Sequence, residues 1–174
     1  MEKAFRINRG LEPGQYRLEE VFADVRACDA LCSLFADPHE VDRIIERTQV
    51  FVADRPGEMF VDNDDGSITV GLMHLRTASD AVLYLDIIHE LCHVKQHLEG
   101  RDLYDREKPY VDRETEIEAY LVTVQEARRI GLTDEAITNY LRVSWITPEE
   151  HRRLVRRMGV AGEIRDCLPQ PEAG

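Results

Sequence analysis

The sequence predicts an α+β fold in which a small, mostly antiparallel three-stranded sheet packs against two long helices, with further helices flanking them. Three short segments between residues 48 and 75 are rich in β-branched and aromatic residues, which is typical of strands. Before and after them, apolar residues recur at helical spacing behind capping residues. No linker divides the 174 residues, so we expect one domain over residues 1–167 and a disordered tail over 168–174.

The predicted elements follow one another as helices, then sheet, then helices. Amphipathic spacing predicts a first helix over Leu18–Phe35, and Asp37-Pro38 opens a second that ends near Thr48. The turn residues at 63–66 join the second and third strands into a hairpin. Strands are expected over residues 48–53, 59–62 and 67–75, and later helices over 79–99, 112–130, 133–143 and 147–158.

Residues 89–93 read His-Glu-Leu-Cys-His, an HExxH motif inside the predicted helix 79–99. Histidines four residues apart project from one face of a helix, so both rings can reach one zinc ion. Glu90 follows the first histidine and is placed to take a proton from a water molecule that the metal activates. The motif therefore makes His89 and His93 the expected zinc ligands and Glu90 the expected catalytic base.

A catalytic zinc ion needs a third protein ligand, with water in the fourth position. His97 is a poor source, because it lies about 12 Å from His89 along the helix axis. The acid-rich start of the next helix, which Asp112 is expected to cap, is a better one. Its carboxylates alternate in direction, and Glu116 lies on the more apolar face. We therefore expect Glu116 to be the third ligand, with Glu118 as the alternative.

The motif and the later Glu116-Ile117-Glu118-Ala119 together resemble the gluzincin clan of zinc metallopeptidases, above all its minimal-core members, the minigluzincins. The resemblance covers roughly residues 60–125 and implies a zincin-like fold. It also implies that Glu116, three residues before the alanine, binds zinc. In such families an edge strand beside the active-site helix pairs with an extended substrate. Two positions depart from the pattern: Tyr120, where many relatives have Asp or Asn, and Lys95, which is often apolar in peptidases.

These features predict a zinc metallopeptidase that acts on a peptide or protein substrate. Glu90 would take a proton from the attacking water and then protonate the leaving amine. A donor to the developing oxyanion is also expected, and the candidates are Tyr104, Tyr110 and Tyr120. His74 either faces the cleft or is an ordinary strand residue. Two other functions remain open: a non-catalytic metal-binding or interaction module, and a zinc hydrolase of a non-peptide amide or ester.

Composition narrows the partners. The formal net charge of −12 argues against binding to DNA or RNA, and four arginines between residues 152 and 157 are expected to form a solvated basic face. Neither a signal peptide nor a stretch able to span a bilayer is recognisable, so we expect a cytoplasmic protein without membrane contact. Cys167 gives one further hypothesis, in which its thiolate occupies the metal and keeps the enzyme latent.

Overall fold

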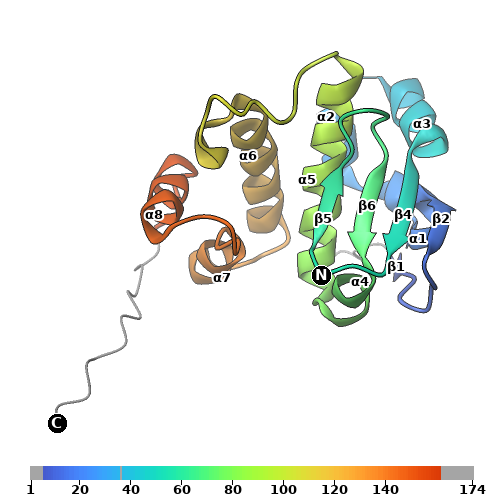
Figure 1. Ribbon diagram of the computed structural model, residues 1–174, viewed down its shortest axis with the longest axis horizontal. Coiled ribbons are helices and arrows are strands. Elements are labelled where there is room, and N and C mark those ends of the chain that lie inside the picture. The colour runs from blue at the N-terminus through green and yellow to red at the C-terminus, as the bar shows by residue number, and fades with distance from the viewer. Residues whose placement is uncertain (1–5, 36, 162–174) are drawn as a thin grey trace, which may run out of the picture.

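The computed structural model of the protein describes residues 6–35 and 37–161, and the expected tail and Cys167 lie outside these ranges. It confirms the α+β class (Figure 1). The sheet and the short N-terminal helices form one side of the molecule, and the C-terminal helices form the other. The long helix α5 (Asp80–Leu98) runs between the two and packs against α6 (Glu114–Arg129). Helices α7 (Asp134–Tyr140) and α8 (Pro148–Arg157) complete the C-terminal side.

The sheet has four strands in the order β2-β4-β6-β5, so the prediction of three strands was wrong. The central strands β4 and β6 are parallel, and the two outer pairs are antiparallel. Strand β2 was missed because its side chains are mostly exposed and give no apolar alternation. The strands are β2 (Gly14–Arg17), β4 (Gln49–Ala53), β5 (Met59–Val61) and β6 (Ile68–Gly71), and β1 (Arg6–Ile7) pairs separately with β3 (Phe22–Ala23).

Strand β6 ends at Gly71, although the sequence predicted a strand as far as Leu75. A Cβ atom at position 71 would lie 2.2 Å from the carbonyl oxygen of Gly57, so only glycine allows this close approach. Helix α4 (Leu72–Thr77) begins at once, and it buries Leu72 and Leu75 at helical spacing. His74 therefore lies on a helix and not on a strand.

The single helix predicted over 18–35 is also wrong. The chain forms α1 (Leu18–Val21), strand β3, the 3₁₀ helix η1 (Val25–Ala27) and α2 (Asp29–Leu34). Asp24 has a φ angle of 68°, which breaks any continuous helix at that point. The spacing of apolar residues predicts which side chains are buried, but it does not show that the chain changes direction at Asp24. Helix α3 (Pro38–Arg47) follows as predicted.

Helix α5 has the predicted extent. Its N-cap Ser79 accepts a hydrogen bond from the backbone of Val82, and Gly100 follows its C-terminus with a φ angle of 76°. From Leu83 to Val94 every side chain is buried, because the sheet covers one side of α5 and α6 covers another. The motif is thus held on a rigid, packed element. Among the described residues, no helix is both long and apolar enough to cross a membrane.

The start of α6 differs from the prediction. Its N-cap is Arg113, which caps nothing with its side chain, and the expected cap Asp112 belongs to the 3₁₀ helix η2 (Tyr110–Asp112). The carboxylate of Asp112 instead accepts hydrogen bonds from Arg153 at 2.7 Å and from Arg157 at 3.1 Å. Two of the arginines expected to be merely solvated therefore tie α8 to the start of α6.

Candidate metal centre

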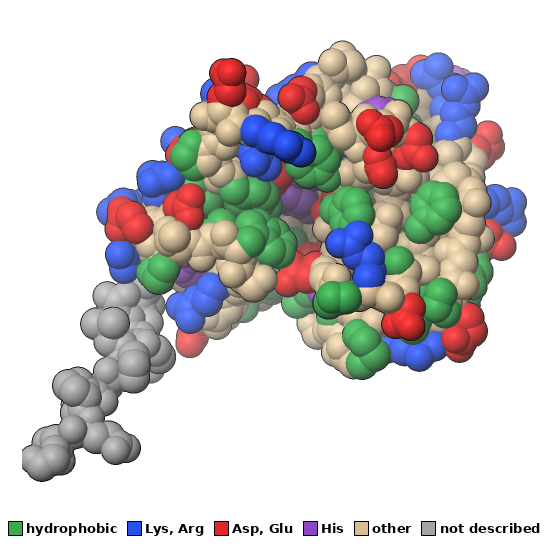
Figure 2. Space-filling view, in the orientation of Figure 1, with side chains coloured by type: hydrophobic (Ala, Val, Ile, Leu, Met, Phe, Trp, Pro, Cys, Tyr) green, Lys and Arg blue, Asp and Glu red, His purple; other side chains and the backbone are tan. Residues whose placement is uncertain are grey.

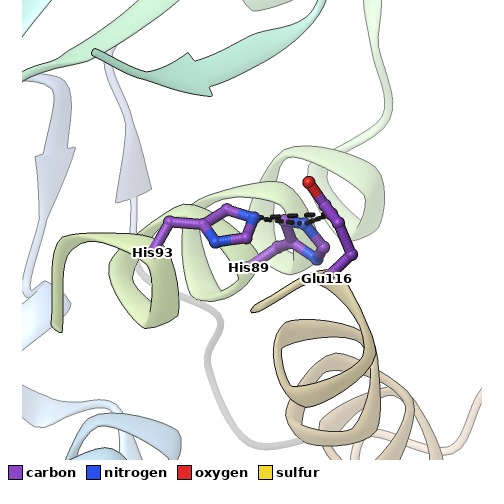
Figure 3. A group of neighbouring side chains, drawn as sticks. All are labelled: His89, His93 and Glu116. Carbon is purple, nitrogen blue, oxygen red and sulfur yellow. Dashed lines mark hydrogen bonds and ion pairs between the residues drawn. The ribbon is translucent and has the colours of Figure 1, made fainter. Parts of the chain in front are cut away.

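Helices α5 and α6 bring three metal-binding side chains to one point (Figure 3). His89 and His93 come from α5, and Glu116 comes from the first turn of α6. The two Nε2 atoms lie 3.1 Å apart, and Glu116 Oε2 lies 3.3 Å from that of His89 and 3.5 Å from that of His93. All three side chains are buried. The structure thus assembles the three residues that the sequence indicated.

The geometry of this trio fits a metal ion. Ligand atoms held tetrahedrally around zinc at roughly 2.0–2.2 Å are about 3.3–3.5 Å from one another. The separations of 3.1, 3.3 and 3.5 Å are close to that value. Two imidazoles and one carboxylate also form the donor set of catalytic sites that keep one position open. The buried trio can therefore hold a metal ion.

The same three groups are strongly coupled electrostatically. Burial alone would raise the pKa of Glu116, but the hydrogen bonds and charges of His89 and His93 hold it well below its usual range. Burial would likewise lower the pKa of His93, yet Glu116 outweighs it and raises that pKa to about 9. A metal ion bound by these groups would displace any proton that they share.

Gln96 orients His93 and is the residue that sequence reasoning missed. His93 Nδ1 lies 2.7 Å from Gln96 Oε1, and donation to this amide oxygen leaves Nε2 free to bind a metal. The amide nitrogen of Gln96 donates to the carbonyl of Thr115 and to Glu118, both at 3.0 Å. The sequence offered one clue, which is the place of Gln96 about one helical turn after His93. One amide thus links the second histidine to the residue before Glu116.

Glu118, the alternative third ligand, is not part of the trio. Its carboxylate pairs with Arg101 at 2.5 Å and accepts from Gln96. His97 also lies elsewhere, with its ring against Gly66. His74 does not line the cleft; its Nε2 lies 2.7 Å from the carboxylate of Asp86, which does.

Glu90 has the environment expected of a reacting group. Its side chain is 6% exposed, and its Oε2 has no hydrogen-bond partner in the part of the chain that the structure describes. Burial first, and then the negative charges of Glu116 and Asp86, raise its pKa against the opposing effect of the two histidines. A buried carboxylate oxygen without a partner is costly, so it marks a place where a ligand or water belongs.

The trio and Glu90 open into a cleft of about 650 Å³. Figure 2 shows the hollow between the two sides of the molecule, with histidine and acidic side chains inside it. The edge strand β5 and the loop before it form one wall, and residues of η2, α7 and the loop after α7 form the other. Trp145 lies on this second wall and is 52% exposed.

All three candidate oxyanion donors line the cleft, but their hydroxyl groups have different hydrogen-bond partners. Tyr104 donates its hydroxyl to the carbonyl of Val61 at 2.5 Å, so this hydroxyl is already engaged. The hydroxyls of Tyr110 and Tyr120 lie 2.9 Å apart. The ring of Tyr120 packs on His89, with ring centroids 4.5 Å apart. Tyr120 thus stands beside the first histidine, whose Nδ1 is buried without a partner among the described residues.

Comparisons with known proteins do not place the chain in a family. No protein-family model matches it, and neither a curated protein nor a solved structure does. The function must therefore be argued from the site itself.

Proposed function

We propose that this protein is a zinc-dependent metallopeptidase with a zincin-like fold, of the gluzincin type. One observation carries the proposal: the buried trio of His89, His93 and Glu116 shares a cleft with a carboxylate oxygen of Glu90 that has no partner in the described part of the chain. Two histidines and a glutamate are a common ligand set of peptidase zinc sites, and an adjacent glutamate is their usual base. The trio, the base and the cleft all come from the elements around the HExxH motif.

The residues of the chain have distinct parts in this mechanism. His89, His93 and Glu116 would hold zinc, and Gln96 and the packed helix α5 would fix their positions. When bound, zinc supplies Lewis-acid chemistry, which lowers the pKa of water and polarises a carbonyl group. Glu90 would accept the proton of the attacking water at Oε2 and later deliver it to the leaving amine.

The walls of the cleft support an extended peptide as substrate. Strand β5 pairs with β6 on one side only, so it is an edge of the sheet, and its residues line the cleft. An edge strand can take a peptide as an additional strand through backbone hydrogen bonds. The opposite wall presents the aromatic rings of Tyr110, Tyr140 and Trp145, which suit apolar side chains of a substrate.

The metal content of purified variants tests the zinc site. We expect about one zinc ion in the wild-type protein and in Glu118→Ala, and its loss in His93→Ala and Glu116→Ala. Glu118→Ala is the matched control, because it removes a neighbouring carboxylate of α6 that lies outside the trio. Zinc lost in Glu118→Ala and kept in Glu116→Ala would refute this ligand set.

Cleavage of unfolded proteins and of small amides by the zinc-loaded protein tests the activity. We expect cleavage of unfolded protein, and Glu90→Gln should keep its zinc while its rate falls by roughly 10²–10⁴-fold. Cleavage of small amides alone would instead indicate a non-peptide hydrolase. Full zinc loading without any hydrolysis would indicate a non-catalytic metal-binding module.

A further inference from the structure

The cleft contains two carboxylates that neither hold the metal nor act as the base. Asp86 lies on α5 one turn before Glu90, and Glu58 lies immediately before the edge strand β5. Both line the same cleft as the trio. They therefore form an acidic wall beside the reacting groups.

Asp86 is fixed in place. Its side chain is 12% exposed, and its two oxygens accept from Tyr140 at 2.9 Å and face His74 Nε2 at 2.7 Å. Each carboxylate oxygen has two lone pairs, so Asp86 can accept further hydrogen bonds from a ligand. The carboxylate is therefore both rigid and able to bind.

Glu58 is open to the cleft. Its side chain has no ion pair within the described ranges 6–35 and 37–161, whereas its backbone carbonyl accepts from Gly71 and fixes the position of the residue. Partial burial, and then the negative charge of Asp86, raise the pKa of Glu58 against a smaller opposing effect of His74. The negative charges of the two carboxylates thus repel each other, and a cation placed near both would relieve this repulsion.

The carboxylate of Glu90, in the same cleft, is a further sign that this part of the molecule is built for a ligand. Its buried Oε2 has no hydrogen-bond partner among the described residues. Among the described residues, no arginine of the cleft forms an ion pair with Glu58 or Asp86; Arg55 and Arg113 lie over the rings of Phe60 and Tyr110. Within the described ranges, His74 is thus the one basic side chain at ion-pair distance from these carboxylates.

We propose that Glu58 and Asp86 form a subsite that binds a lysine or arginine side chain of the substrate, next to the bond that is cleaved. This inference rests on the proposed peptidase function. Asp86 and Glu90 are four residues apart, which is about 6 Å along the axis of a helix. An extended peptide advances about 3.3 Å per residue, so a long side chain beside the cleaved bond can reach the subsite.

Matched peptides test the subsite. A peptide that the enzyme cleaves is resynthesised with lysine, with uncharged norleucine or with glutamate at each position flanking the cut. We expect kcat/KM to be about tenfold higher with lysine than with norleucine, and lowest with glutamate. The ratio should approach one in Glu58→Gln, fall in Asp86→Asn, and reverse towards glutamate in Glu58→Lys.

Glu46→Gln is the control, because Glu46 is an exposed carboxylate of α3 away from the cleft, and it should keep the wild-type ratio. Equal cleavage of all three peptides would overturn the subsite while the peptidase function stands.

If no peptide is cleaved, the peptidase proposal fails, and a peptide-binding measurement then tests the subsite. The fluorescence of Trp145, the chain's one tryptophan, then reports binding of acetylated hexa-alanine amides that carry one lysine or one norleucine. Tighter binding of the lysine peptide, lost in Glu58→Gln, would uphold the subsite, and equal binding would overturn it.

Discussion

The two sides of the cleft are built differently. On the sheet side, α5 and the strands share a continuous apolar core, in which Leu83, Leu85 and Ile88 are fully buried. The helical side contributes to the same core, for example through Val124 and Leu154, and it is tied by polar contacts as well. These join Asp112 to Arg153 and Arg157, and Tyr140 to Asp86. The histidines belong to the first side and Glu116 belongs to the second. The difference suggests a rigid half that presents the motif and a more adjustable half that completes the metal site.

The largest effect should come from the rigid half. Leu85→Ala would remove a fully buried side chain of α5 and leave a cavity, which lowers the free energy of unfolding by about 2–5 kcal/mol. Leu121→Ala on α6, whose side chain is 51% exposed, is the matched control and should change it by less than about 0.5 kcal/mol. Urea unfolding measures both. Similar losses in the two variants would contradict the stabilising effect of burial at Leu85.

Gln96→Ala tests the link between the halves. The variant loses the hydrogen bond that orients His93 and the one to the carbonyl of Thr115. We expect zinc affinity to fall by about 10–100-fold, as it does when other outer partners of a metal ligand are removed. Competition with a chelator measures this affinity. Unchanged affinity in a folded variant would show that α5 alone orients the histidine.

Asp112→Ala tests the polar ties of the helical half. It removes both ion pairs to α8, and since these groups are partly exposed, we expect a loss of only about 1 kcal/mol in the free energy of unfolding. Hydrogen exchange should rise in α8 and stay unchanged in the sheet. Glu149→Ala, which removes ion pairs within α8, should not loosen its docking. Exchange that rises equally in the sheet would contradict independent halves.

The smallest effect concerns pH. Glu126 of α6 accepts a hydrogen bond from Tyr84 of α5 and pairs with Arg129 at 2.7 Å. Burial would raise its pKa, but Arg129 and Tyr84 lower it below the usual 4.5. A carboxylate with a lowered pKa stabilises the folded state at pH values above its pKa in the unfolded chain. This stabilisation is lost as the pH falls through the pKa of the folded state.

Urea unfolding at pH 7 and at several values below 4.5 tests this pH dependence. Glu126→Gln should be less stable than the wild-type protein at pH 7, and the difference should shrink in acid. A difference that stays constant with pH would mean that the charge of Glu126 does not contribute.

Sequence reasoning reached the trio because its geometry is local. Histidines at i and i+4 on one helix must share a face, and Glu116 could be separated from Glu118 by the apolar face that it occupies. Helix α5 was predictable for the same reason, since its capping serine and its terminating glycine each lie next to one end of the helix in the sequence.

The missed features depend on distant neighbours. Asp86 and Gln96 are polar residues inside a buried helix, and their partners come from α4, α6 and α7. Strand β2 is short and exposed, so only its pairing with β4 defines it. The turn at Asp24 left the apolar spacing intact, and that is why the split of the first predicted helix was not visible in the sequence.

The position of the trio along the chain has a consequence for the order of folding. His89 and Glu116 are 27 residues apart, whereas Tyr140 and Asp86, which join the cleft wall to α5, are 54 apart. The entropy of loop closure grows with length, by about 0.6 kcal/mol per doubling, so the shorter loop closes more readily. During synthesis, the proposed metal ligands also emerge before α7 and α8 are made. A zinc ion could therefore be captured by the nascent α5–α6 pair before the far wall of the cleft is in place.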